Sequence, residues 1–87
     1  MKRIGIIGAG AWGTALAMVA RRAGRDVVIQ AREADVAAAI NAGHENPVYL
    51  PGVALDPAIR ATTDIVQAAA GADAVLLSVP SQFMRAA

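Results

Sequence analysis

Residues 8–13 read Gly-Ala-Gly-Ala-Trp-Gly and place three glycines in the spacing GxGxxG. The run before them, residues 3–8, is short, aliphatic and rich in isoleucine, which predicts a strand rather than a helix. Residues 11–23 contain no proline and carry apolar side chains at helical spacing, and Gly24 follows as an expected helix end. The glycines therefore form the turn between a strand and a helix, and this context decides the interpretation of the whole chain.

Each glycine of this turn has a physical task if the turn binds the paired phosphates of a dinucleotide. Gly8 permits the tight turn, Gly10 lets a pyrophosphate approach the backbone, and Gly13 lets the helix pack closely on the strand. The start of the helix offers unpaired N–H groups and a partial positive charge to the phosphates. A P-loop would need Gly-Lys-Ser/Thr, which this turn lacks. The alternative is a tight strand-to-helix turn that binds no ligand.

Strand and helix patterns alternate along the rest of the chain. We expect strands at 26–30, 59–63 and 74–79, helices at 33–42 and from about 64 to 70, and a proline-rich loop at 46–57. Gly43 is expected to end the helix at 33–42, and Thr63 or Asp64 to cap the next one. This alternation predicts the α/β class, a doubly wound parallel sheet with strand order 3-2-1-4, as in part of a Rossmann fold.

The chain stops shortly after its last predicted strand. We therefore expect residues 1–87 to form a single incomplete NAD(P)-binding Rossmann domain, truncated before its second half. The strand at 74–79 then lies at an edge of the sheet without its neighbour. An open aliphatic edge is a template for pairing with another chain, so we expect the isolated chain either to self-associate there or to be only marginally stable.

Composition excludes several classes of protein. Eight basic and seven acidic residues leave a net charge of +1, which argues against a nucleic-acid binder, and a hydrophobic content of 56% argues against disorder. Without cysteine and with one histidine, the chain predicts no disulfide and no metal site. Glycines interrupt the longest uncharged run, so we expect neither a membrane helix nor a signal peptide, and infer a cytoplasmic setting.

Arg32 and Glu33 follow the second predicted strand and bear on the choice of cofactor. NAD-specific sites usually place Asp or Glu there to bind the ribose hydroxyls. Arg32 can meet a 2′-phosphate with its planar charged group, while Glu33 can bind ribose hydroxyls or favour the following helix start. We predict NADP(H) over NAD(H); the alternative for Arg32 is a solvent-exposed surface arginine.

Three aromatic residues and one histidine have two interpretations each. Trp12 is either a packing anchor or a wall of the cofactor site, and Tyr49 either packs its loop onto the sheet or approaches the cofactor. Phe83 follows the last strand, where ligands of open α/β sheets gather, and borders the nicotinamide or belongs to the core. His44 is interpreted as structural, because a lone loop histidine is more often structural than catalytic.

Three segments together resemble the amino-terminal part of the NAD(P)-dependent glycerol-3-phosphate dehydrogenases. They are GAGAWGTALA at 8–17, HENPVYLPG at 44–52 and VPSQF at 79–83. The middle segment is the most specific, because most Rossmann families have no such loop. The resemblance runs over essentially the whole chain, with one departure: Gln30 stands where the family commonly has an aromatic residue.

The resemblance implies reversible hydride transfer between NAD(P)H and dihydroxyacetone phosphate, which yields sn-glycerol 3-phosphate for phospholipid synthesis. The cofactor contacts that it implies are Gly8, Gly10, Ala11, Trp12, Gly13, Arg32 or Glu33, Tyr49 and Phe83. In the family, the catalytic lysines and a helical substrate domain lie beyond position 87, and the only lysine here is Lys2. We therefore assign no catalytic residue, and expect the phosphorylated substrate to bind only to the full-length protein.

Two alternatives to this function stay open. One is the Rossmann domain of another NAD(P)-dependent dehydrogenase, acting on ketopantoate, a 2-hydroxyacid or a nucleotide sugar; the loop at 44–52 counts against it. The other is a non-catalytic NAD(P)-sensing module. Residues downstream of Ala87 would decide, because lysines and a helical domain favour the enzyme, and a regulatory or DNA-binding domain favours the sensor.

Overall fold

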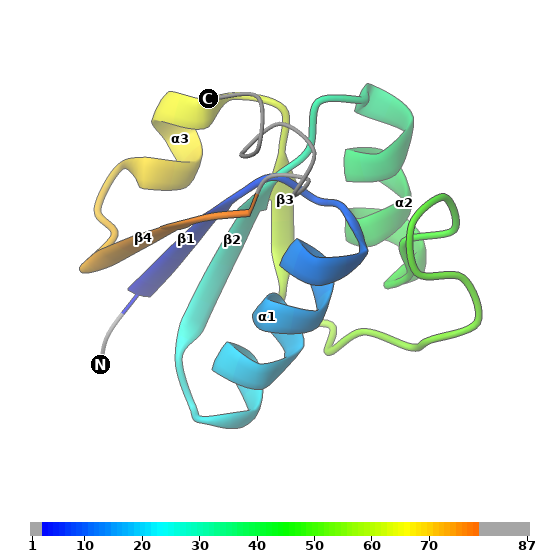
Figure 1. The fold of residues 1–87 in the computed structure, drawn as a ribbon, viewed down its shortest axis with the longest axis horizontal. Coiled ribbons are helices and arrows are strands. Elements are labelled where there is room, and N and C mark those ends of the chain that lie inside the picture. Colours follow the sequence, from blue (N-terminus) through cyan, green and yellow to red (C-terminus); the bar gives the residue numbers. More distant parts are fainter. Residues whose placement is uncertain (1–2, 79–87) are drawn as a thin grey trace, which may run out of the picture.

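A four-stranded parallel sheet with helices on both sides organises the computed structural model, which describes residues 3–78 (Figure 1). The elements in chain order are β1 Arg3–Ile7, α1 Ala11–Arg22, β2 Asp26–Gln30, α2 Ala34–Gly43, β3 Arg60–Thr62, α3 Ile65–Ala69 and β4 Ala74–Leu77. The strand order is β3-β2-β1-β4 and every pairing is parallel, which confirms the predicted topology. In Figure 1, α1 and α2 lie on one side of the sheet and α3 lies on the other.

The core lies between the central strands and α1 and α2. Its largest members are Ile6 of β1, Val27 and Ile29 of β2, and Val36 and Ile40 of α2, each at most 2% exposed. Side chains alternate between the two faces of a strand, so Val27 and Ile29 share one face of β2. Aliphatic residues dominate these positions because a parallel sheet is covered on both faces.

The second helix differs by one residue at each end from its predicted range. Glu33 has an extended backbone and serves as the N-cap, so α2 begins at Ala34. Gly43 is the last helical residue, and His44 follows it in the left-handed conformation, with φ of 55°. The helix thus ends at Gly43, as predicted, and His44 provides its C-cap.

The two edge strands of the sheet, β3 and β4, differ in whether another part of the chain covers them. At the β3 edge, the side chain of Asn41 in α2 pairs with both backbone groups of Ala61: Nδ2 donates to the carbonyl at 2.9 Å and Oδ1 accepts from the N–H at 2.8 Å. At the other edge, Val75, Leu76 and Leu77 of β4 are 40–73% exposed. An amide that occupies an edge in this way protects it against pairing with another chain, so β3 is protected and β4 is open within residues 3–78.

Candidate functional site

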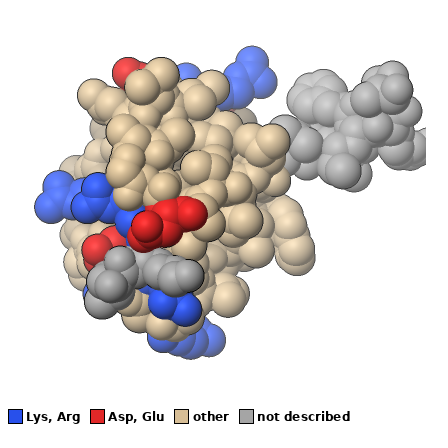
Figure 2. Space-filling model, turned by 90° about the vertical axis from the view of Figure 1, so that its left-hand side faces the viewer, with Lys and Arg blue, Asp and Glu red and all other residues tan. Residues whose placement is uncertain are grey.

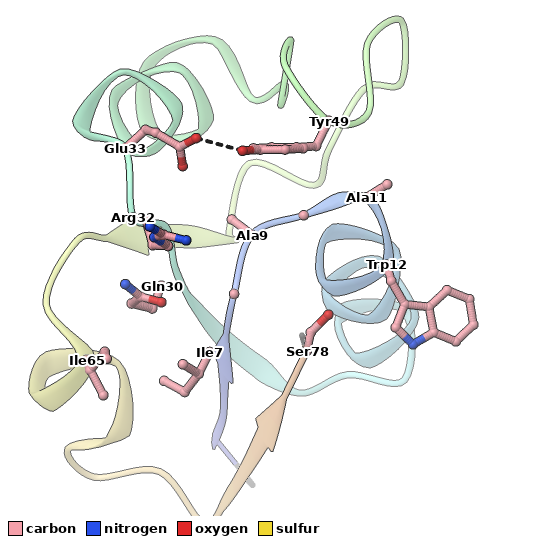
Figure 3. Close-up of a pocket in the computed structure, with 12 residues that line it drawn as sticks. Ile7, Ala9, Ala11, Trp12, Gln30, Arg32, Glu33, Tyr49, Ile65 and Ser78 are labelled. Atoms are coloured by element: carbon pink, nitrogen blue, oxygen red, sulfur yellow. Dashed lines mark hydrogen bonds between the residues drawn. The ribbon is translucent and has the colours of Figure 1, made fainter. Parts of the chain in front are cut away.

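A cavity of about 520 Å³ opens at the carboxyl end of the sheet (Figure 3). Its wall comes from the ends of three strands, the glycine turn, the starts of α2 and α3, and the loop between α2 and β3. The lining residues are Ile7, Gly8, Ala9, Gly10, Ala11, Trp12, Gln30, Arg32, Glu33, Tyr49, Ile65 and Ser78. Gly8 N donates to Gln30 O at 3.0 Å and Ser78 N donates to Ile7 O at 2.8 Å, which holds the three strand ends together. Open α/β sheets bind their ligands at this position.

The glycines of the turn differ in what surrounds them. Gly8 has φ of +107°, and a Cβ there would collide with the Ser78 carbonyl. A Cβ on Gly13 would collide with the Gly8 carbonyl, so both positions require glycine for close packing of backbone on backbone. A Cβ on Gly10 would meet nothing within 4 Å. Packing of the protein therefore explains Gly8 and Gly13 but leaves the absence of a side chain at Gly10 unexplained.

The start of α1 presents its backbone amides to this cavity. Gly10 is the N-cap, no side chain caps the helix, and the first turn contains no acidic residue. The first backbone hydrogen bond belongs to Thr14, whose N–H donates to the Gly10 carbonyl at 2.9 Å. The N–H groups that precede it have no intrahelical acceptor and carry the positive end of the helix dipole. Since Gly10, Ala11 and Trp12 all lie on the cavity wall, this arrangement suits an anion.

The loop after α2 is fixed to the glycine turn by a buried amide. Asn46 is fully buried, and its Nδ2 donates to the Ala9 carbonyl at 2.7 Å and to Thr14 Oγ1 at 2.9 Å. Its Oδ1 accepts from Tyr49 N at 3.1 Å. A buried amide needs partners for its polar atoms, and here those partners belong to the turn, to α1 and to the loop itself.

Tyr49 and Glu33 face each other across the upper part of the cavity in Figure 3. The phenol donates a hydrogen bond of 2.6 Å to Glu33 Oε2. This hydrogen bond and the negative charge of Glu33 raise the pKa of Tyr49, because both favour the neutral phenol. Arg32 precedes Glu33, is exposed, and lies on the same wall. A cation and a carboxylate thus stand next to one another at the tip of β2.

The residues that the sequence singled out are brought together with two exceptions. Gly8, Gly10, Ala11, Trp12, Arg32, Glu33 and Tyr49 line the one cavity, while Gly13 supports the turn from behind and Phe83 lies outside the described residues. Trp12 is 71% exposed among the described residues, so the packing-anchor interpretation is wrong for this part of the chain. Tyr49 is 40% exposed and lies on the cavity wall, as its second interpretation requires.

Sequence reasoning did not find several residues that build this site. Ser78 and Ile65 follow β4 and β3, and the rule that ligands gather at the carboxyl ends of strands could have identified both. That rule does not apply to Asn46 and Thr14, and their mutual contact could not be predicted from local spacing because they lie 32 residues apart.

Residues 3–78 contain no group of three or more His, Cys, Asp or Glu side chains that can hold a metal ion. Over the same range, no helix combines the length and the apolar character that crossing a bilayer requires.

Known proteins resemble this chain in sequence. The family model for the NAD-dependent glycerol-3-phosphate dehydrogenase N-terminus matches residues 3–87. The glycerol-3-phosphate dehydrogenase [NAD(P)+] of Paramagnetospirillum magneticum is 62% identical over 87 residues, which cover 100% of this chain and 31% of that protein. That of Rhodospirillum rubrum is 60% identical over 82 residues, 94% of this chain and 24% of that protein. The chain thus spans between 24% and 31% of the length of these two relatives.

Solved structures agree with the sequence comparison. The glycerol-3-phosphate dehydrogenase of Coxiella burnetii superposes with a TM-score of 0.82 at 36% identity, over 92% of this chain and 25% of that one. That of Plasmodium falciparum gives a TM-score of 0.82 at 31% identity, over 98% and 26%. With the GxGxxG turn, the 3-2-1-4 sheet and the loop at 44–52 in place, the chain belongs to the family of NAD-dependent glycerol-3-phosphate dehydrogenase amino-terminal domains.

Proposed function

We propose that this chain is the cofactor-binding part of a glycerol-3-phosphate dehydrogenase and that its cavity holds a nicotinamide dinucleotide, with the pyrophosphate on the glycine turn. The observation that carries the proposal concerns Gly10: no protein atom lies within 4 Å of a Cβ placed there, and yet this position on the cavity wall has no side chain. The free amides at the start of α1 are suited to the two negative charges of a pyrophosphate. A cavity of about 520 Å³ is within the usual range for a cofactor site.

The proposed roles of the wall follow from the chemistry of each group. The backbone at Gly8, Gly10, Ala11 and Trp12 takes the phosphates, with Gly13 permitting the close approach of α1. Arg32 is assigned to a 2′-phosphate and Glu33 to ribose hydroxyls, so the two residues favour NADP(H) and NAD(H) respectively. Tyr49 borders the adenosine side of the site, and Phe83 is assigned to the nicotinamide side.

The activity that we propose for the full-length protein is the reversible reduction of dihydroxyacetone phosphate to sn-glycerol 3-phosphate, which feeds phospholipid synthesis. The relatives are named for glycerol-3-phosphate and NAD(P)+, and this supports the assignment. When bound, the cofactor supplies the hydride; the residues described here bind and orient it, and carry no cation placed for a developing oxyanion. We therefore propose that the 87-residue chain alone gives no turnover. Its cytoplasmic location stays a prediction.

Two matched glycine substitutions test the proposal in the full-length protein. An added Cβ meets nothing within 4 Å at either Gly10 or Gly43, but only Gly10 lies on the cavity wall. In Gly10→Ala the new methyl group should keep the pyrophosphate away from the backbone amides. We expect this to weaken the binding of NADH and NADPH by about tenfold or more, because loss of one hydrogen bond to a charged group costs about 1.5–3 kcal/mol. Gly43→Ala should leave both affinities unchanged.

Isothermal titration calorimetry with both cofactors gives the readout. If the unaltered protein bound neither NADH nor NADPH, the dinucleotide assignment would be wrong. Equal affinities for the unaltered protein and Gly10→Ala would mean that the pyrophosphate lies elsewhere.

We also propose that the isolated chain self-associates through β4. The support is the contrast between the edges: Asn41 occupies the β3 edge, while Leu77 of β4 is 73% exposed. Figure 2 views the molecule from the left-hand side of Figure 1, where β4 and α3 lie, and uncharged side chains cover much of that face. Exposed aliphatic residues of α3, Ile65 and Val66, add to this apolar surface. A second copy of β4 fits such an edge.

A further inference from the structure

The orientation of the Ala9 carbonyl sets this glycine turn. That carbonyl accepts a hydrogen bond of 2.7 Å from Asn46 Nδ2 and a longer one of 3.4 Å from Thr14 Oγ1, in a region where Asn46 is fully buried and Ala9 is 6% exposed. The assignment of the amide atoms is unambiguous, because the Ala9 oxygen can only accept and the Tyr49 N–H on the other side can only donate. Both Nδ2 hydrogens are used, the second by Thr14 Oγ1 at 2.9 Å.

The direction of this carbonyl fixes the direction of the next amide. Residues 3–78 contain no cis peptide bond, and in a planar trans peptide the C=O and the following N–H point in opposite directions. Since the Ala9 carbonyl points at Asn46, the Gly10 N–H points away from Asn46. Gly10 lies on the cavity wall, and no acceptor within residues 3–78 takes a hydrogen bond from its N–H.

We infer that Asn46 is a positioning residue of the cofactor site: it turns the peptide between Ala9 and Gly10 so that the Gly10 N–H is presented to the pyrophosphate. The inference rests on the proposed dinucleotide function. Through Oδ1 and the Tyr49 N–H, the same amide also ties the loop between α2 and β3 to the turn. Asn46 therefore acts on the cofactor through the backbone and does not touch it, which is why the GxGxxG pattern does not reveal it.

A purely structural role for Asn46 would have a different signature. A residue that only tethers the loop would change the stability of the protein and leave the strength of pyrophosphate binding in the folded protein unchanged. A residue that orients the Gly10 N–H must affect ligands with a pyrophosphate group and spare those without one. The comparison of NADH or ADP with adenosine separates the two roles.

The sharpest variant is Asn46→Asp, which keeps the shape and the acceptor for Tyr49 N but replaces the nearer of the two donors to the Ala9 carbonyl by an oxygen that repels it. The matched control is Asn41→Asp, because Asn41 also bonds one backbone carbonyl and one backbone N–H but lies at the β3 edge outside the cavity. In the full-length protein we expect Asn46→Asp to weaken NADH and ADP binding by about tenfold or more and to leave adenosine binding unchanged. Asn41→Asp should bind all three as the unaltered protein does.

A measurement on the unaltered protein makes the test independent of whether Asn46→Asp folds. In full-length protein labelled with ¹⁵N-glycine, the Gly10 amide resonance should move downfield on addition of NADH or ADP and stay in place with adenosine. A Gly10 resonance that does not move on addition of ADP would overturn the inference. A folded Asn46→Asp protein with unchanged NADH affinity would also overturn it, as would equal weakening of NADH binding by Asn46→Asp and Asn41→Asp.

The proposed function and this inference fail in different ways. If the unaltered protein bound neither NADH nor NADPH, the proposed function would fail and this inference with it. If the unaltered protein bound NADH and Asn46→Asp bound it equally well, only this inference would fail.

Discussion

The phenol oxygen of Tyr49 lies 2.6 Å from Oε2 of Glu33, and this contact joins the loop between α2 and β3 to the N-cap of α2 across the cavity (Figure 3). The contact engages one carboxylate oxygen and leaves the other available to a ligand. Arg32 precedes Glu33 on the same wall, so groups of opposite charge lie next to one another where we propose that a ribose hydroxyl or a 2′-phosphate binds.

Ionisation of Tyr49 should report on this contact. The hydrogen bond to Glu33 and its negative charge raise the pKa of Tyr49 above the ordinary value of 10.0. The hydrogen bond from the neutral phenol to Glu33 therefore stabilises the folded state fully below pH 10.0, and this stabilisation is lost as the pH rises through the raised pKa of Tyr49. Ultraviolet difference titration of the chain, in which Tyr49 is the only tyrosine, should give a midpoint above that of free tyrosine.

Two carboxylate substitutions provide the comparison for Tyr49. Glu33→Gln should lower the midpoint toward the ordinary value, because the charge is removed. Asp35→Asn, a change of the same kind in the first turn of α2, should leave it where it is. An identical midpoint for Glu33→Gln and the unaltered chain would contradict the prediction.

Substitution of Arg32 should separate the two cofactors. We expect Arg32→Ala in the full-length protein to weaken NADPH binding by about 10- to 100-fold, since a charge-assisted hydrogen bond to phosphate contributes about 1.5–3 kcal/mol. NADH affinity should not change. Arg22→Ala, at the exposed end of α1, is the control and should alter neither value in calorimetric titration. Equal loss for both cofactors, or no loss, would identify Arg32 as a surface residue.

Glycine at position 13 should be required for stability rather than for binding. Gly→Ala within a helix normally stabilises it by up to about 1 kcal/mol. Here the new Cβ would collide with the Gly8 carbonyl, so we expect Gly13→Ala to destabilise the protein by about 1–3 kcal/mol. Thermal melting should show a lower Tm for Gly13→Ala than for Gly10→Ala, whose Cβ meets no atom within 4 Å. A Tm for Gly13→Ala at or above that of the unaltered protein would show that the backbone contact can relax.

Charge at the open edge should reduce self-association of the isolated chain. Leu77 of β4 and Val19 of α1 are 73% and 64% exposed, so lysine fits at either position without disturbing the core. We expect Leu77→Lys to shift the chain toward monomer in sedimentation velocity, because lysine on an edge strand disfavours pairing. Val19→Lys adds the same charge away from β4 and should leave the distribution unchanged. A chain that is already monomeric without substitution would refute the self-association proposal.

Local rules were sufficient for the elements of this fold. Aliphatic runs with β-branched residues identified β1, β2 and β4, and Asp64 caps α3 through a 2.8 Å bond from Val66 N, one of the two caps predicted. The same rules identified Gly43 as the end of α2, but they did not predict that His44 would follow it in the left-handed conformation. A histidine can hold this conformation because a positive φ, although uncommon, is accessible to a few non-glycine residues.

The sequence by itself determined the class, the strand order, the glycine turn and the family resemblance, because these depend on periodicity, residue type and spacing over short distances. Only the tertiary structure decided which of the candidates share a wall: it joined Tyr49 to Glu33 and buried Asn46 between Ala9 and Thr14. Contacts of this kind connect residues that are far apart in the chain, and a fully buried amide is satisfied by whichever groups the fold brings to it. The pattern of neighbouring residues in the sequence therefore did not predict the contacts of Tyr49 and Asn46.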